Sequence, residues 1–234
     1  MAADRWYEAA LDLKRVAIQM NDPARALSAV LESQARYLCL AKMAAKAGQC
    51  QPDLVIEIDR CLEVVDAYTF VEKHRVADSG SQSTGYAFAA LSSELRMREL
   101  VKTLLSMGVK HCTVWAIRVI IAGGQAFISG NQQLLKETWK AIVSEDNWEE
   151  LGAVDAGDEL LHNALTQTAV YQGALMSYHS RLGKSCASAL ASDRDQMAEI
   201  CAYLGNRIMA DVAAKAFVMG STGVTMAAHR DEQM

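Results

Sequence analysis

The stretch "EDNWEELGAVDAGDELLH", residues 145–162, joins an apolar segment to a long amphipathic one, and it indicates how the chain folds. Asp146 lies at the break and is of the residue type that caps the first turn of a helix, so we expect a helix to begin here. Glu159 and His162 follow in the spacing E-x-x-H, which places a carboxylate and an imidazole on one side of that helix. The stretch therefore predicts helices and raises one candidate site.

Downstream of Asp146, similar residues recur every seven positions. One set is Val154, Leu161, Thr168, Leu175 and Leu182, and its partner set, which alternates between apolar and polar, is Leu151, Asp158, Leu165, Gln172 and His179. Such a repeat is typical of a bundle or coiled-coil seam whose polar positions fix the register. We expect a long amphipathic helix up to a break at Gly183. Its predicted interaction face consists of Leu151, Val154, Leu161, Leu165, Leu175 and Leu182.

The composition of the 234-residue chain favours helices throughout. Hydrophobic residues make up 51% of it and aromatic residues only 6%, while Pro23 and Pro52 are the only prolines. Alanine and leucine lose little freedom on entering a helix. We therefore predict an all-α helical bundle with long amphipathic helices, about seven to nine in number. Its expected core is formed by Leu27, Leu38, Leu62, Leu91, Leu161, Leu165 and Leu175.

Glycine, proline and serine mark the expected boundaries along the chain. Gly48 ends one predicted helix and Pro52 starts the next. The stretch "DSGSQSTG" is rich in serine and glycine and lacks helical periodicity, which is typical of a linker. The predicted organisation is an N-terminal helical segment at 1–77, a linker at 78–85, a C-terminal helical segment at 86–218 and a flexible tail at 219–234. One continuous bundle is the alternative.

Two segments fit both a strand and a helix. Residues 54–58 and 113–121 are rich in β-branched side chains, which suit buried strands. Short apolar runs cannot be assigned by periodicity alone. However, the chain shows no regular alternation of strands and helices, and Gly123-Gly124 lacks the wider glycine pattern of a phosphate-binding turn. For 113–121 we therefore favour a buried helix that ends at these glycines.

No catalytic signature accompanies the E-x-x-H spacing. Di-iron carboxylate bundles carry E-x-x-H on two helices, and the sequence holds no second copy. Glu159 and His162 are thus weak metal-ligand candidates. We expect a polar edge pair here, no catalytic residues and no cofactor. The cysteines form no C-x-x-C pair and are expected to be reduced core residues; they are Cys39, Cys50, Cys61, Cys112, Cys186 and Cys201.

Charge and hydropathy exclude further classes of partner. The net charge of −5 argues against a nucleic-acid-binding protein, which needs a basic face for phosphates. No apolar run reaches the roughly eighteen residues of a membrane span, so we expect a protein that is not transmembrane. The N-terminal stretch "MAADRWYEAALDLKR" carries charges throughout and lacks the apolar core of a signal peptide. The expected location is the cytoplasm.

A sequence pattern similar to that of the stretch at residue 145 occurs near the N-terminus. A shift of 124 residues places Asn21 over Glu145, so that Asp22 matches Asp146 and Leu27 matches Leu151. The shared pattern is a helix, an acidic break and a longer amphipathic helix, and whether the two halves are a true repeat stays open. Over residues 8–48 and 131–184 this pattern resembles that of phasins, bacterial proteins that coat polyhydroxyalkanoate granules.

The predicted function follows from the amphipathic helices and from this resemblance. We expect a non-enzymatic protein that self-associates as a homo-oligomer and binds a hydrophobic surface or partner. The phasin resemblance implies that this surface is a polyhydroxyalkanoate granule, and it brings no catalytic residues with it. One alternative is a regulatory or adaptor bundle that binds a partner protein. The other is a helical metalloenzyme that uses Glu159 and His162.

Overall fold

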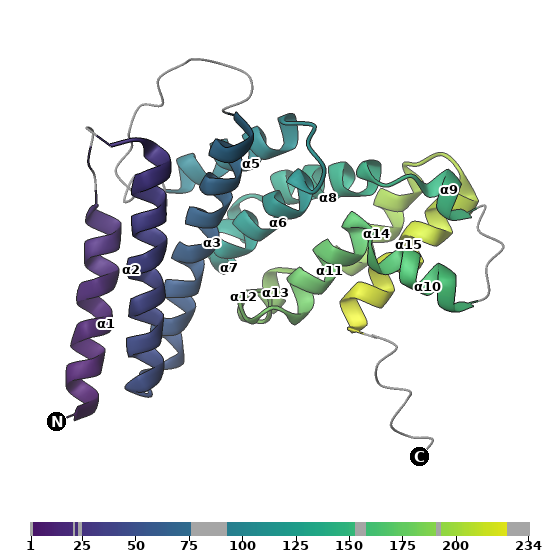
Figure 1. Cartoon of the computed structure of the whole chain (residues 1–234). Helices are drawn as coiled ribbons and strands as arrows, with labels where there is room; N and C mark the ends of the chain where they lie inside the picture. The colour runs from purple at the N-terminus through teal and green to yellow at the C-terminus, as the bar shows by residue number, and fades with distance from the viewer. Residues whose placement is uncertain are drawn as a thin grey trace. The chain divides into compact units, whose positions relative to one another are not determined.

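The computed structural model of the chain describes residues 2–20, 22, 25–75, 93–152, 158–190 and 193–223 (Figure 1). Within these ranges it contains fourteen α-helices and no strand, which confirms the all-α prediction. The expected number of about seven to nine helices is wrong. The number is higher because turns divide the expected long helices into short consecutive ones.

The chain divides into two compact units, Met1–Leu104 and Leu105–Met234. We call them the N-terminal unit and the C-terminal unit. The predicted linker at 78–85 lies outside the described residues, as do Leu91 and the part of the predicted tail beyond Gly223. The organisation around this linker therefore stays a prediction.

Three long helices of the N-terminal unit run side by side, with the second packed against both others (Figure 1). Two ion pairs tie these helices together. Lys14 pairs with Glu57 between the first and the third, and Lys42 Nζ lies 2.6 Å from Asp59 Oδ1 between the second and the third. The helices of this unit are α1 (Ala2–Gln19), α2 (Leu27–Ala47), α3 (Pro52–Arg75) and, for most of its length, α5 (Glu94–Ser106).

Gly48 allows the close contact between α1 and the turn that follows α2. A Cβ atom on Gly48 would lie only 2.5 Å from the Cβ of Trp6, so any side chain here would push α1 away. The backbone N–H of Gly48 donates to the carbonyl of Ala44, and Gln49 takes the left-handed conformation with φ 49°. Pro52 then begins α3. The sequence placed this helix end and this helix start correctly.

The C-terminal unit is a cluster of shorter helices. α6 packs against α8 and α11, α11 packs against α15, and α14 packs against α8 and α15. In the core, the Trp139 ring meets the Phe217 ring edge-on with the ring centres 5.5 Å apart. The helices are α6 (Cys112–Ala122), α7 (Gly124–Gly130), α8 (Gln132–Glu145), α9 (Trp148–Gly152), α10 (Asp158–Thr166), α11 (Ala169–His179), α12 (Arg181–Ser185), α13 (Ala187–Leu190), α14 (Asp193–Ala202) and α15 (Arg207–Thr222).

Both segments that fit either a strand or a helix are helical. Residues 54–58 lie in α3, and residues 113–121 lie in α6, which ends just before Gly123. Most α6 side chains are buried, with Ile117 and Ile120 fully so. A helix that is apolar on all sides is stable only when other elements surround it. The β-branched content of α6 thus reflects burial, and the helix interpretation is confirmed.

The expected long helix with the seven-residue repeat is broken at two capping residues. Thr168 has an extended backbone, and its hydroxyl accepts a hydrogen bond from the N–H of Tyr171. Ser180 also has an extended backbone, and its hydroxyl accepts a hydrogen bond from the N–H of Gly183. Threonine and serine favour such caps because their short side chains reach the free N–H groups of the next turn. The repeat therefore extends over α9 to α12 instead of one helix, and the prediction of one continuous helix is wrong.

The predicted core leucines differ in burial. Leu38 and Leu165 are fully buried. Leu27, Leu62, Leu161 and Leu175 are only partly buried. The cores also contain large buried side chains that the leucine pattern did not single out. They include Leu31 and Ile58 in the N-terminal unit and Trp139 and Ile142 in the C-terminal unit.

Candidate functional site

Two adjacent carboxylates at the end of α8 hold other helices of the C-terminal unit. The Glu145 side chain accepts a hydrogen bond from the backbone N–H of His111 at 2.6 Å and another from the Thr113 hydroxyl. These donors lie at the start of α6, where free N–H groups favour a negative charge. Glu145 therefore caps α6, although 34 residues separate it from His111.

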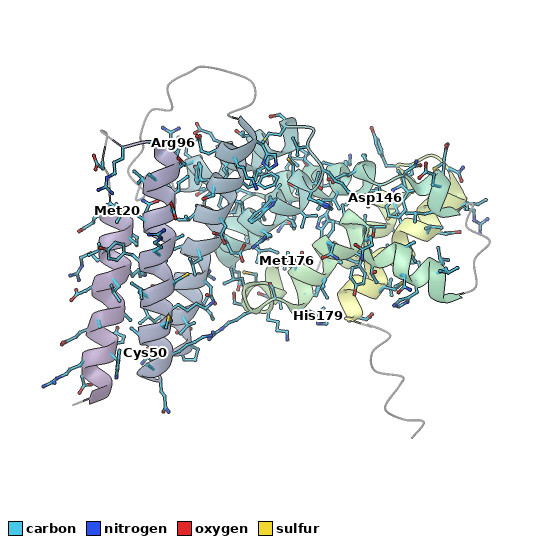
Figure 2. The ribbon with its side chains drawn as sticks, viewed as in Figure 1. Met20, Cys50, Arg96, Asp146, Met176 and His179 are labelled. Carbon is cyan, nitrogen blue, oxygen red and sulfur yellow. The ribbon has the colours of Figure 1, made fainter. Side chains whose placement is uncertain are left out.

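Asp146, labelled in Figure 2, caps a second helix in the same way. Its carboxylate accepts hydrogen bonds from the backbone N–H groups of Ala169 at 3.0 Å and Val170 at 3.3 Å, at the start of α11. The sequence predicted that Asp146 caps a helix, but it assigned the cap to the helix that follows directly. Burial raises the pKa of Asp146 above its ordinary value of 3.8, and it outweighs the opposing effect of the two hydrogen bonds.

The Glu145–Asp146 pair is a structural junction. Each side chain accepts from the first turn of a different helix, so α8 fixes the starts of both α6 and α11. The Trp148 indole N–H donates to the Val143 carbonyl at 2.6 Å and anchors the next turn of the chain. A raised carboxyl pKa also occurs in general acids. Here both oxygens of Asp146 are used on the backbone, which favours the structural role.

Of the two E-x-x-H residues, the structure describes the side chain of His162, whereas the Glu159 side chain lies outside the described part of the chain. His162 is partly buried, and its Nε2 has no hydrogen-bond partner among the described residues. Within those residues, no group of three or more His, Cys, Asp or Glu side chains is placed to hold a metal ion. Another histidine, His179 (labelled in Figure 2), has a structural role, because its Nε2 lies 2.9 Å from the Ser221 carbonyl oxygen.

One cleft lies between α14 and α15. Its volume is about 440 Å³, and small residues form most of its walls: Ala198, Ala202, Gly205, Ala210 and Ala214, joined by Cys201, Asn206, Arg207 and Asp211. Burial raises the pKa of the Cys201 thiol to about 11. The thiol is therefore protonated near neutral pH and is a poor nucleophile. The cleft can take a small apolar group, but Cys201 gives no support for covalent catalysis in it.

The predicted interaction face is only partly available to a partner. Leu165 and Leu182 are buried inside the C-terminal unit. Leu151, Leu161 and Leu175 are partly buried, and Val154 lies outside the described residues. A seven-residue repeat records which side chains face other helices, but it does not distinguish helices of the same chain from those of a partner. The face as a whole stays a prediction.

A different apolar face is exposed on α2. Tyr37, Leu40 and Met43 expose 36%, 50% and 66% of their surface, and their spacing of three residues places them along one side of the helix. We call these three residues the α2 apolar face. The opposite side of α2, with Leu31, Leu38 and Ala41, is buried in the core. The sequence pattern did not distinguish this face, because α2 has apolar residues on both sides.

Aromatic and charged residues lie around the ends of the α2 apolar face. Trp6 and Tyr7 of α1 are 48% and 44% exposed, and the contact of Trp6 with Gly48 places this part of α1 beside the C-terminal end of α2. Lys46 is exposed in the last turn of α2, and an exposed Arg36–Glu32 pair lies near its start. Apolar residues flanked by amphipathic aromatics and by lysine are typical of interfacial helices.

No family model, curated protein or solved structure matches the chain. Among the described helices, no single one is long and apolar enough to cross a membrane. Only the bent pair of α6 and α7, which meet at 111°, passes that test of length and composition together. Function must therefore be inferred from the surfaces of the two units.

Proposed function

We propose that this chain is a cytoplasmic, non-enzymatic protein that self-associates and binds a hydrophobic surface through the α2 apolar face. The observation that carries the proposal is the exposure of Tyr37, Leu40 and Met43 on a helix whose other side is already packed. The free energy of the system falls when such a row of apolar side chains is removed from water. The phasin-like sequence pattern suggests a polyhydroxyalkanoate granule as the surface.

The size of the face explains why self-association belongs to the proposal. Full burial of a large apolar side chain contributes about 1.5–3 kcal/mol, so three side chains that are half exposed contribute roughly 2–5 kcal/mol together. This corresponds to a dissociation constant roughly in the millimolar range for one copy, before the cost of association. Two linked copies on the same surface gain avidity, which brings binding to roughly micromolar.

The α2 apolar face suits a surface better than a partner helix. A partner helix binds in a groove between elements. The α2 face is a row on one outward side of a single helix, and none of its three residues lines the cleft between α14 and α15 or the cleft beside Gly48. An extended apolar phase needs no groove.

The test is binding of the full chain to hydrophobic particles. Leu40→Lys and Met43→Lys together place two charges on the α2 apolar face and are expected to abolish co-sedimentation with polyhydroxybutyrate or oil particles. Leu95→Lys is the matched control, because Leu95 of α5 is 65% exposed and lies outside the face. The control should bind as the unchanged chain does.

Two results would overturn the proposal. One is equal binding of the double variant and the unchanged chain while both keep the same circular dichroism spectrum. The other is no binding of the unchanged chain to any particle. Stoichiometric binding of one protein, lost on a single change in the face, would instead establish the adaptor alternative. Stoichiometric iron, manganese or zinc that is lost in His162→Ala would establish the metalloenzyme.

A further inference from the structure

The outward side of α15 carries a self-complementary row of residues. Ile208 and Val218 are 64% and 56% exposed, and Asp211 and Lys215 between them are exposed as well. We call these four residues the α15 seam. The other side of the helix, with Ala213, Ala216, Phe217 and Gly220, is buried in the C-terminal unit. The seam is therefore the side of α15 that the fold leaves open.

The spacing of the seam is that of a two-helix contact. Its members follow one another at intervals of three, four and three residues. Alternating steps of three and four are the repeat of the a and d positions that form the contact in paired helices. The row is also symmetric about Ala213, because Ile208 and Val218 lie equally far from it in sequence, and so do Asp211 and Lys215.

This symmetry selects one orientation for a second copy. When two α15 helices cross antiparallel at residue 213, Ile208 of each lies opposite Val218 of the other, and Asp211 lies opposite Lys215. Both charged layers are then attractive and both outer layers are apolar. A parallel pairing would place Asp211 against Asp211 and Lys215 against Lys215, which is repulsive. The same patch on both copies meets itself, as a twofold axis requires.

We infer that two copies of this chain pair through antiparallel α15 helices. Ala210 and Ala214 lie beside the seam in the wall of the cleft between α14 and α15. Their small side chains permit close approach, and the cleft offers space beside the seam for the apolar side chains of a second copy. Among the described residues, neither Asp211 nor Lys215 has an ion-pair partner within its own chain. This inference rests on the self-association in the proposed function, and it assigns that association to a surface distinct from the α2 apolar face.

Charge reversal tests the pairing with a specific pattern of outcomes. Asp211→Lys and Lys215→Asp each make both charged layers repulsive in a homodimer, which should weaken the dimer on the order of 100-fold in sedimentation velocity. A mixture of the two variants should form a heterodimer, because each layer then joins opposite charges. Lys184→Asp, an exposed charge change in α12, should leave the dimer unchanged.

An antiparallel contact also predicts a specific cross-link. In a mixture of Ile208→Cys and Val218→Cys chains, peptide mass spectrometry should find a disulfide that joins positions 208 and 218 of two copies. Links between two 208 positions would indicate a parallel pairing and overturn the inference. Unchanged dimers in both charge variants would also overturn it while leaving the proposed self-association in place. A chain that stays monomeric at every concentration would overturn both the α15 pairing and the proposed self-association. Loss of particle binding in the α2 variants would leave the α15 pairing unaffected.

Discussion

Substitution of Asp146 by alanine should destabilise the C-terminal unit by removing the cap of α11. The change leaves the N–H groups of Ala169 and Val170 without their acceptor, and these two residues are only 2% and 0% exposed. Water therefore cannot readily replace the carboxylate. Loss of a cap costs about 0.5–2 kcal/mol, and a buried unsatisfied donor costs about 1–3 kcal/mol. We expect a loss of about 2 kcal/mol, which lowers Tm by roughly 4–8 °C.

Asp146→Asn serves as the matched control because asparagine keeps one acceptor oxygen and is also a good cap. We expect it to lose about half as much stability as the alanine variant. Thermal unfolding followed by circular dichroism, supported by urea titration, measures both. Equal stability of all three proteins would refute the reasoning that this carboxylate holds the start of α11.

The raised pKa of Asp146 also predicts a pH dependence. Because the folded chain binds the proton of Asp146 more tightly than the unfolded chain does, the contribution of Asp146 to folding stability is most favourable below its ordinary pKa of 3.8. This contribution to stability declines as the pH rises through the higher pKa of the folded chain. The stability of the unchanged chain relative to Asp146→Asn should therefore fall over that window. A relative stability that rises with pH would show that the hydrogen bonds of Asp146 outweigh its burial.

Two further predictions concern packing and thiols. Gly220→Ala should cost about 1–3 kcal/mol in urea unfolding, because its Cβ would lie 2.5 Å from the Tyr171 carbonyl oxygen. Gly152→Ala, whose nearest contact would be an ordinary 3.4 Å, is the control, and equal effects would contradict the close packing of α15 on α11. In iodoacetamide labelling of the native chain, exposed Cys39 should react well before buried Cys201, whose thiol pKa is raised to about 11. Equal labelling rates would contradict that burial.

The fold class was predictable because it depends on composition and on local signals. Abundant alanine, two prolines and few aromatics favour helices without reference to tertiary contacts. The Gly48 stop and the Pro52 start are likewise local. The helix number was not predictable in the same way. Thr168 and Ser180 act as caps only when the chain turns there, and their residue types alone are also compatible with a helix interior.

The partners of the capping residues could not be read from the sequence. Asp146 was recognised as a cap, but its helix begins 23 residues further on, and nothing in local spacing connects it to Ala169. The exposed faces were missed for a related reason. The repeat from Val154 to Leu182 is clear in the sequence, yet burial depends on which helices the chain brings next to each side, and this is a tertiary property.

Oxidation of Met43 gives the most direct test of the claim that α2 contacts a hydrophobic surface. Met43 is 66% exposed and belongs to the α2 apolar face, whereas Met209 of α15 is partly buried and lies outside both proposed contacts. Hydrogen peroxide should convert Met43 to its sulfoxide quickly in the free protein. On polyhydroxybutyrate or oil particles Met43 should become protected from oxidation, while the oxidation rate of Met209 should be unchanged. An equal rate at Met43 on bound and free protein would contradict it.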